Sequence, residues 1–237
     1  GQFVGSSDVS GKYGDGKFTG TVHGNLLESL VKTLEQDEHI AVAYGRQIPD
    51  RKSNVPERYT RTFNYPAVSV VKSKADLPKL GIKTYFCSNV CAAYRRKIYQ
   101  KLGGFEKHII FNEDMVFAAR AIQQGYYVAY DAEAVVRHSH DYTCKQLVKR
   151  NFDMGVSQVC YPEIFQSVKS EREGIRMVLK ILDELAGRKE FLQMWKFITE
   201  SSCKYVGYQL GKHYKWLPRR MVMRLTMNET YWKERKE

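Results

Sequence analysis

The sequence lacks any run of about 18 uncharged apolar residues, the length that a membrane-spanning helix needs, so we expect no such helix. Its opening stretch, GQFVGSSDVSGKYGDGKFTG, also lacks the apolar segment of a secretory signal peptide. Cysteines are few: there are five, and none of them forms a C-x-x-C pair. An odd number of widely spaced cysteines is typical of reduced thiols, so we predict a cytoplasmic protein.

Apolar and basic residues, by contrast, are plentiful. Hydrophobic residues make up 43% of the chain and aromatic residues 13%, which is enough to bury a core and excludes wholesale disorder. The 237 residues suit one large domain, or one domain with an appendage. Lys and Arg outnumber Asp and Glu by 38 to 26, which gives a formal net charge of +12.

The first part of the chain alternates between helical and strand-like patterns. Residues 1–24 are rich in glycine and predict a loop or a poorly ordered lead-in. Asn25 and Glu28 fit a capping box, so a helix is expected over 25–37. The other elements expected here are strands at 40–44, 85–93, 127–130 and 134–136, and helices at 94–102 and 114–124. This alternation favours an α/β layer structure.

Two further segments complete the outline. Residues 49–82 are polar and contain four prolines, which predicts a long excursion over the surface. After Asp141 the periodicity is helical, with helices expected at 175–185, at 191–210 and from Pro218 onward. We therefore expect a lead-in at 1–24, an α/β region at 25–142 and a helical, basic region at 143–237.

An acidic pair, Glu113-Asp114, stands at the start of the helix expected from residue 114. The helix dipole and the free N–H groups of a first turn stabilise a carboxylate there, which would keep Asp114 ionised. An ionised carboxylate is what a general base for a sugar hydroxyl requires, and we expect Asp114 to face an open cleft. The alternative is that both residues only cap the helix, as acidic residues in a first turn commonly do.

A second candidate is Arg137-His-Ser-His-Asp141, directly after a predicted strand. Because side chains alternate along a strand, His138 and His140 would point the same way and could reach one cation. Histidines at strand edges and interfaces are also common, so metal binding and an ordinary surface position both stay open at this point.

These segments resemble the acceptor half of inverting family 2 glycosyltransferases of GT-A fold, and among them bacterial rhamnosyltransferases. The resemblance spans roughly residues 25–233 and rests on segments in a constant order. They are YGRQIPD (44–50), FNYP (63–66), GIKTYFCSN (81–89), GGFE with NED (103–114), HSH (138–140), KRNFDMG (149–155) and YVGYQLGKHYKWLP (205–218). It implies an α/β fold with a mixed, GT-A-like sheet, of partial nucleotide-diphospho-sugar transferase type, and a helical C-terminal appendage.

The resemblance also implies an activity and roles for particular residues. The activity is single displacement with inversion, with a nucleotide-sugar donor, dTDP-L-rhamnose, a divalent metal (Mg²⁺ or Mn²⁺) and a lipid-linked glycan acceptor. It makes Asp114 the catalytic base, with Glu113 beside it, and assigns His138 or His140 to the metal or diphosphate. The residues that it places on the substrate side are Arg46, Gln47, Ser88, Asn89 and Gly104.

One portion of the family pattern is not found. Such enzymes have a nucleotide-binding βαβ portion that ends in an aspartate-containing metal motif just before the helix equivalent to 25–37. Asp8 and Asp15, in the Gly-rich stretch at that place, match no such motif. We therefore expect this chain to bind the donor weakly or not at all and to show little transferase activity by itself. We also expect an open sheet edge that either residues 1–24 or a second copy of the chain would cover.

The basic C-terminal part has its own alternatives. Residues 201–237 carry nine Lys or Arg against three Glu, interleaved with aromatic residues and methionine. This composition suits a helix on an anionic membrane surface, here the inner face of the cell membrane. An ordinary solvated helical face is the alternative; nucleic-acid binding is not expected, since no nucleic-acid module is visible.

Two functions from different classes fit these observations. The first is a glycosyltransferase of bacterial cell-surface polysaccharide synthesis. The second is a non-catalytic remnant of such an enzyme that binds an acceptor, a membrane or a partner protein. Stabilisation by a nucleoside diphosphate sugar would separate them, because a ligand of the folded state raises its melting temperature.

Overall fold

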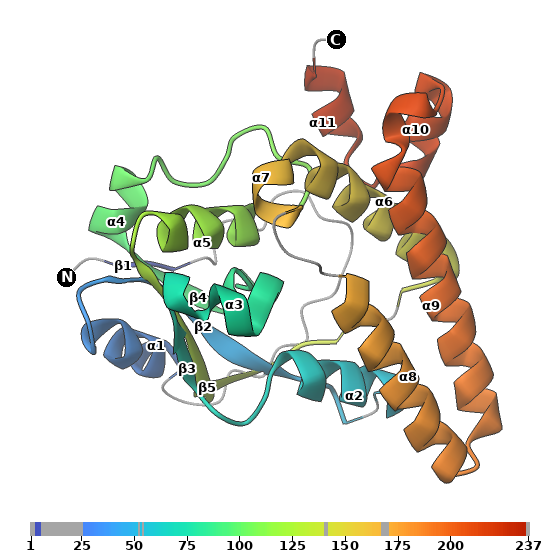
Figure 1. Cartoon of the computed structure of the whole chain (residues 1–237), viewed down its shortest axis with the longest axis horizontal. Coiled ribbons are helices and arrows are strands. Elements are labelled where there is room, and N and C mark those ends of the chain that lie inside the picture. Colours follow the sequence, from blue (N-terminus) through green and yellow to red (C-terminus); the bar gives the residue numbers. More distant parts are fainter. Residues whose placement is uncertain are drawn as a thin grey trace. The chain divides into compact units, whose positions relative to one another are not determined.

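The chain divides into two compact units in the computed structural model, which describes residues 3–5, 26–51, 53, 55–139, 142–166 and 171–235. Among these residues, unit 1 comprises 3–5, 26–106 and 113–139, and unit 2 comprises 107–112 and 142–235 (Figure 1). Four residues named above lie outside the described residues: the expected N-cap Asn25, the second histidine His140, and Asp8 and Asp15.

Unit 1 is built on a mixed five-stranded sheet of order β1-β4-β2-β5-β3. Its strands are β1 (Phe3–Gly5), β2 (Ile40–Ile48), β3 (Val70–Lys72), β4 (Ala92–Arg95) and β5 (Tyr127–Arg137). The central strands β2 and β5 are parallel, and the other three neighbouring pairs are antiparallel. The predicted α/β fold with a mixed sheet is thereby confirmed.

Helices lie on both faces of this sheet (Figure 1). They are α1 (Leu26–Glu35), α2 (Val55–Asn64), the 3-10 turn η2 (Lys74–Asp76), α3 (Leu77–Leu80), the 3-10 turn η3 (Gly81–Thr84), α4 (Arg96–Lys101) and α5 (Glu113–Gln123). Leu30 and Leu34 of α1 share a core cluster with Ala93 of β4. The next residue, Tyr94, packs instead against Phe117 of α5, with ring centroids 5.2 Å apart. Because neighbouring strand residues face opposite sides, α1 and α5 cover opposite faces of the sheet.

Several predicted boundaries in unit 1 were wrong. The strand expected at 85–93 begins only at Ala92, because 85–91 form an irregular segment whose buried polar residue Ser88 is satisfied by a side chain. The excursion at 49–82 contains α2, β3 and α3, and the strands at 127–130 and 134–136 are one strand, β5. The lead-in contains β1, which pairs with β4, so residues from 1–24 do cover that edge of the sheet.

A bulge interrupts the pairing of β2 with β5. Gly45 is paired with Asp131, but the next residue of β2, Arg46, is paired with Val135. The carboxylate of Asp131 organises the extra residues: Oδ1 accepts hydrogen bonds from the backbone N–H groups of Glu133 (2.9 Å) and Ala134 (3.3 Å). A Cβ on Gly45 would lie 2.4 Å from the carbonyl oxygen of Ala134, so glycine is required where the two strands come this close.

Unit 2 contains only helices among its described residues. They are α6 (Cys144–Cys160), α7 (Pro162–Phe165), α8 (Glu171–Gly187), α9 (Phe191–Lys212), the 3-10 turn η4 (Tyr214–Trp216), α10 (Arg219–Leu225) and α11 (Glu229–Glu234). The helices expected at 175–185 and 191–210 are α8 and α9, and the one expected from Pro218 is α10. Phe152 and Val156 of α6 form a core cluster with Tyr214, Val222 and Trp232.

Helices α6 and α9 make the tightest contact in unit 2, and they do so through glycine. A Cβ on Gly207 of α9 would lie 2.2 Å from the carbonyl oxygen of Val148, and one on Gly211 would lie 2.1 Å from that of Phe152. From the first of these contacts to the second, the position advances by four residues in α9 and by four residues in α6. The two helices therefore run in the same general direction.

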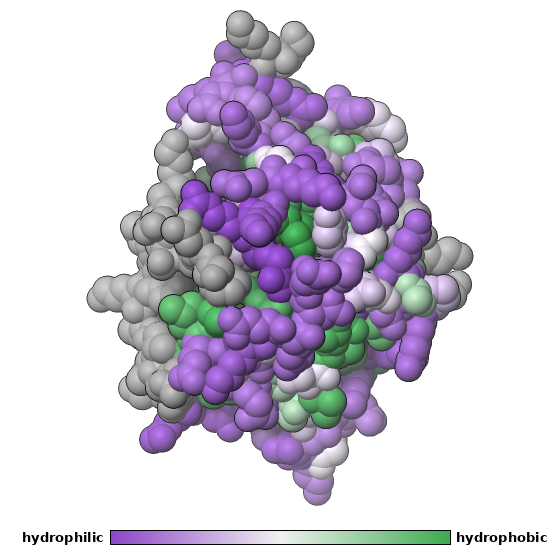
Figure 2. All heavy atoms as spheres, turned by 90° about the vertical axis from the view of Figure 1, so that its left-hand side faces the viewer, coloured by the Kyte–Doolittle hydropathy of each residue, from purple (hydrophilic) through white to green (hydrophobic). Residues whose placement is uncertain are grey.

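The surface is polar where the sheet unit is seen from the side of α1 and α4. Figure 2 shows this face as mostly hydrophilic, with hydrophobic residues visible in small separate areas. In the part of the chain that the structure describes, no helix is both long and apolar enough to cross a membrane.

Candidate active site

The acidic pair stands at the N-terminus of α5, as predicted. The preceding residue, Asn112, has a positive φ of 65°, which turns the chain into the helix. In partly buried Asp114, Oδ1 accepts a hydrogen bond from the N–H of Met115 (2.7 Å) and Oδ2 accepts one from the N–H of Asn89 (3.1 Å). Two backbone donors from different segments therefore fix the orientation of this carboxylate.

Asn89 joins both members of the acidic pair. Its Nδ2 donates a hydrogen bond to Oε1 of Glu113 at 3.0 Å, and its Oδ1 accepts one from the hydroxyl of Tyr94. The irregular segment before β4 and the first turn of α5 are thereby held together. Asn89, Glu113 and Asp114, predicted separately from the sequence, thus lie at one place in unit 1.

Asp114 is not the readily ionised carboxylate that its position in a first turn predicts. Burial of the carboxyl group and the nearby charge of Glu113 raise its pKa to about 7. The hydrogen bonds from Met115 and Asn89 lower the pKa, but they do not outweigh the burial. The expectation of an Asp114 that stays ionised well below neutral pH was therefore wrong. A pKa near the working pH is, however, the value at which a general base is most effective.

A second polar group lies where β2 ends. Nε2 of buried Gln47 donates a hydrogen bond to Oγ of Ser88 at 2.6 Å, and a guanidinium N–H of Arg61 donates one to Oε1 of Gln47. Ser88 is the neighbour of Asn89, so this group and the acidic pair are joined through one short segment. Arg46 is half-buried, and its Nε is buried without a hydrogen-bond partner among the described residues.

Gly104 lies in the turn after α4, where the backbone conformation and a close neighbouring ring both require a glycine. Its φ is +70°, and a Cβ would approach the ring of Tyr99 to 2.9 Å. The ring of Tyr99 packs in turn against Phe105 and Phe117. A role of Gly104 toward a substrate stays a prediction.

The predicted histidine site is described only in part. His138 follows β5, and its backbone N–H donates to the carbonyl of Ile48 at 3.0 Å, which continues the pairing of β5 with β2. Nowhere in the described ranges do three or more His, Cys, Asp or Glu side chains gather as they would to hold a metal ion. The described residues therefore do not form a metal site by themselves.

Three residues that the sequence did not single out contribute to this region. Besides Arg61, they are Tyr65 and Lys72, both buried. Nζ of Lys72 donates hydrogen bonds to the hydroxyl of Tyr44 (3.1 Å) and to the carbonyls of Lys83 (3.1 Å) and Phe86 (2.5 Å). Burial lowers the pKa of Lys72 to about 7 and raises that of Tyr65 to about 12. A lysine inside a Val-Val-Lys strand gives no sequence signal for this role.

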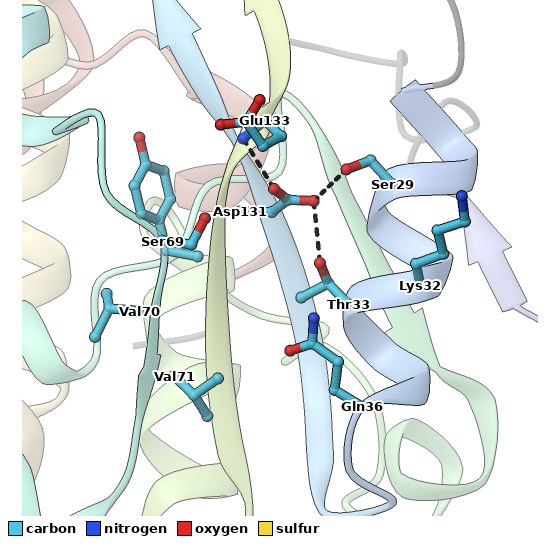
Figure 3. A pocket seen from close by; sticks show the side chains of 10 residues that line it. Ser29, Lys32, Thr33, Gln36, Ser69, Val70, Val71, Asp131 and Glu133 are labelled. Atoms are coloured by element: carbon cyan, nitrogen blue, oxygen red, sulfur yellow. Dashed lines mark hydrogen bonds between the residues drawn. The ribbon is translucent and has the colours of Figure 1, made fainter.

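A cavity of about 380 Å³ lies elsewhere in unit 1, between α1 and the edge strand β3 (Figure 3). Its lining residues are Ser29, Lys32, Thr33, Gln36, Ser69, Val70, Val71, Tyr130, Asp131 and Glu133. Oδ2 of Asp131 accepts hydrogen bonds from Ser29 (2.6 Å) and Thr33 (3.0 Å), so both carboxylate oxygens are already used within the protein. No described residue that we predicted for the active site lines this cavity. The carboxylate of Asp131 stabilises the bulge between β2 and β5.

Comparisons with known proteins add evidence that does not depend on this geometry. Residues 20–152 match the family described as glycosyl transferase family group 2. The chain is 45% identical, over 197 residues, to the O-antigen chain rhamnosyltransferase RfbN of Salmonella typhimurium. It is 42% identical, over 209 residues, to the O-antigen chain rhamnosyltransferase WbaN of Salmonella anatum. These matches cover 83% and 88% of the chain, but only 62% and 66% of the two relatives.

Proposed function

Because the chain belongs to the family 2 glycosyltransferases, we propose that it transfers a sugar from a nucleotide-sugar donor to a glycan acceptor, with Asp114 as the base. The observation that carries this proposal is the carboxylate of Asp114. It is partly buried, held by two backbone donors, and has a pKa of about 7. A group of this kind can take a proton at neutral pH and keep its orientation while it does so.

The reaction is a single displacement. Asp114 takes the proton of an acceptor hydroxyl, and the hydroxyl oxygen attacks the anomeric carbon of the donor sugar. The bond from that carbon to the nucleoside diphosphate breaks with its electron pair, so the diphosphate leaves and the configuration inverts. Asn89 positions Asp114 by its backbone N–H and Glu113 by its side chain. Arg46 and Gln47, with Ser88, would then contact the substrates.

The donor and acceptor are proposed from the two relatives. Both carry the name of O-antigen chain rhamnosyltransferase, which supports dTDP-L-rhamnose as donor and a growing, lipid-linked cell-surface glycan as acceptor. Members of this family generally use a divalent cation, which would balance the charge of the leaving diphosphate. His138 and His140 are the residues that we propose near it, and oxygen ligands preferred by Mg²⁺ or Mn²⁺ would have to complete such a site.

The decisive experiment is transfer by the purified chain and its Asp114→Asn variant. With dTDP-L-rhamnose, Mn²⁺ and a lipid-linked O-antigen acceptor, we expect release of dTDP that requires the acceptor, at a low rate because donor binding by this chain is expected to be weak. Asp114→Asn should lower the rate by roughly 10²- to 10⁴-fold, the usual contribution of a general base. Asp183→Asn, which removes an exposed carboxylate from α8, is the matched control and should keep the rate.

The outcomes separate the competing functions. A normal rate in folded Asp114→Asn would exclude Asp114 as the base. Donor or acceptor binding by calorimetry without any turnover would overturn the enzymatic proposal in favour of a non-catalytic glycan-binding module.

A further inference from the structure

The outward face of α9 carries an apolar and aromatic stripe. Its exposed large residues are Leu192, Trp195, Tyr205 and Val206, and Trp216 follows in η4. Leu192 is 88% exposed and Trp216 is 82% exposed, which is unusual for side chains of this size. Positions 192, 195, 199, 202 and 206 are three or four residues apart, so they lie on one side of the helix. All five are exposed.

The stripe is not needed to hold α9 in unit 2. The side of α9 that packs inward contains buried Phe197 and the two glycines, Gly207 and Gly211, that meet α6. Helix α8, which precedes α9 and contacts it, adds exposed Ile175 and Leu179, one turn apart. The apolar residues of the stripe therefore have a use outside the fold of this unit, since exposing them to water is unfavourable.

Positive charge predominates at the C-terminal end of the stripe, whereas nearer its N-terminal end Glu200 forms an ion pair with Lys196 (3.9 Å). From Ser201 to Asn228 the chain contains no Asp or Glu, whereas it contains six basic residues: Lys204, Lys212, Lys215, Arg219, Arg220 and Arg224. Lys215, Arg220 and Arg224 are exposed in the stretch around Trp216. Met221, also exposed, lies among them. Around Trp216 the surface thus combines an exposed aromatic ring and an exposed methionine with several exposed positive charges.

We propose that this stripe, defined as Leu192, Trp195, Tyr205, Val206 and Trp216, is a membrane-contact surface that lies in the headgroup region of an anionic phospholipid bilayer. Tryptophan and tyrosine favour that region because one part of the ring is apolar and another forms hydrogen bonds. The lysines and arginines bind the lipid phosphates, while Leu192 and Val206 reach the upper acyl chains. The proposal rests on exposure and charge and not on the proposed transferase activity.

Two other occupants fit these observations less well. A two-fold contact between copies of the chain would bring the same predominantly basic surface around Trp216 against itself, so that positive charges would face one another. A nucleic acid would use the cations, but it offers nothing to exposed Leu192 and Val206.

Vesicle binding of the whole chain tests the proposal. We expect the chain to co-sediment with vesicles of phosphatidylcholine and 30% phosphatidylglycerol, and at least tenfold more weakly with phosphatidylcholine alone. Brominated lipids should quench its tryptophan fluorescence. The three tryptophans are Trp195, Trp216 and buried Trp232, so the quenched fraction should fall in Trp195→Phe and again in Trp195→Phe/Trp216→Phe.

A pair of matched charge reversals tests whether vesicle binding depends on the stripe or only on the net charge of the protein. Arg224→Glu and Lys97→Glu change the charge equally, but Lys97 is exposed on α4 in unit 1. We expect Arg224→Glu to weaken vesicle binding at least fivefold and Lys97→Glu to leave it within twofold. Equal weakening by both, no quenching, equal binding to neutral vesicles, or a stable dimer by light scattering that Leu192→Ser disrupts would each overturn the proposal.

Discussion

At the scale of single residues, the chemistry of the proposed site depends on how Glu113 affects Asp114. The charge of Glu113 and the burial of Asp114 both favour the protonated form of Asp114, so its pKa rises from an ordinary value near 4 to about 7. In the folded state Asp114 keeps its proton between these two values, whereas the unfolded chain releases it. The free energy of unfolding contributed by this group therefore falls as the pH rises from about 4 to 7.

This pKa gives a pH-dependent prediction for the proposed reaction. Transfer needs the ionised form of Asp114, so the rate should rise with pH along a limb centred near 7. Glu113→Gln removes the neighbouring charge, and we expect the limb to move to lower pH. The measurement is the pH profile of kcat/KM between pH 5 and 9. Asp183→Asn should not shift the limb, and an unshifted limb in Glu113→Gln would contradict the coupling of the two carboxyl groups.

Lys72 in β3 holds the irregular segment 83–89 against the sheet. Its ammonium group donates to two carbonyls of the segment that leads to Ser88 and Asn89. In Lys72→Met these bonds are lost, although the cost of burying a charge is lost as well, so we expect overall stability to fall by only about 1 kcal/mol.

The local effect of Lys72→Met should be larger than the global one. Backbone amides of residues 83–89 should exchange hydrogen about tenfold faster by mass spectrometry, which corresponds to about 1.4 kcal/mol of local opening. Lys79→Met, at an exposed position in α3, provides the control. Unchanged exchange at 83–89 would show that other contacts hold the segment.

At the scale of elements, the glycines between α6 and α9 give a prediction about packing. Gly207→Ala would gain helix propensity, worth about 1 kcal/mol, but the new Cβ would meet the backbone of Val148 at 2.2 Å. Since backbone cannot move aside cheaply, we expect a net destabilisation of about 1–2 kcal/mol by urea unfolding. Gly174→Ala in α8, where a Cβ meets nothing within 4 Å, should instead stabilise by up to about 1 kcal/mol. A neutral or stabilising Gly207→Ala would disprove the close contact.

The sequence predicted those helices and strands whose residue pattern is complete within one segment, and it missed those that depend on a distant partner. Helices α1, α5, α8 and α9 repeat apolar residues every three or four positions, and that pattern is complete within each helix. Strands β1 and β3 have three residues each and exist because a neighbouring strand pairs with them, which no local pattern records. In the same way, the sequence could single out Asn89 and Asp114 but not their contact, which depends on how β4 and α5 pack. The roles of these residues, and of the metal proposed at His138 and His140, stay predictions.

At the scale of the whole molecule, the two units carry different spectroscopic and chemical reporters. All three tryptophans lie in unit 2, whereas the two buried cysteines, Cys87 and Cys91, lie in unit 1. Tryptophan fluorescence therefore follows unit 2, and labelling of buried thiols follows the opening of unit 1.

This distribution predicts the outcome of thiol titration. In the native chain we expect three thiols, those of Cys144, Cys160 and Cys203, to react with a disulfide reagent at pH 8, and all five to react in urea. Burial raises the pKa of Cys87 to about 12, which suppresses its reactive thiolate further. Cys203, whose hydrogen bond with Cys144 raises its pKa to about 11, should react slowly among the three partly exposed thiols. Rapid native labelling of five thiols would contradict the burial of Cys87 and Cys91.

The parallel course of α6 and α9 also has a kinetic consequence. Helices α8 and α9 are neighbours in the sequence and can form a hairpin early, because only a short loop has to close. Helix α9 can meet α6 only after the chain has gone through α7 and back along α8, so this contact joins residues far apart in the sequence. Such contacts form late in folding, since the entropy of closing the long loop is lost before any packing is gained. During synthesis, the apolar side of α6 therefore stays exposed to solvent until α9 has left the ribosome. In this interval α6 offers the largest apolar surface for a chaperone to bind.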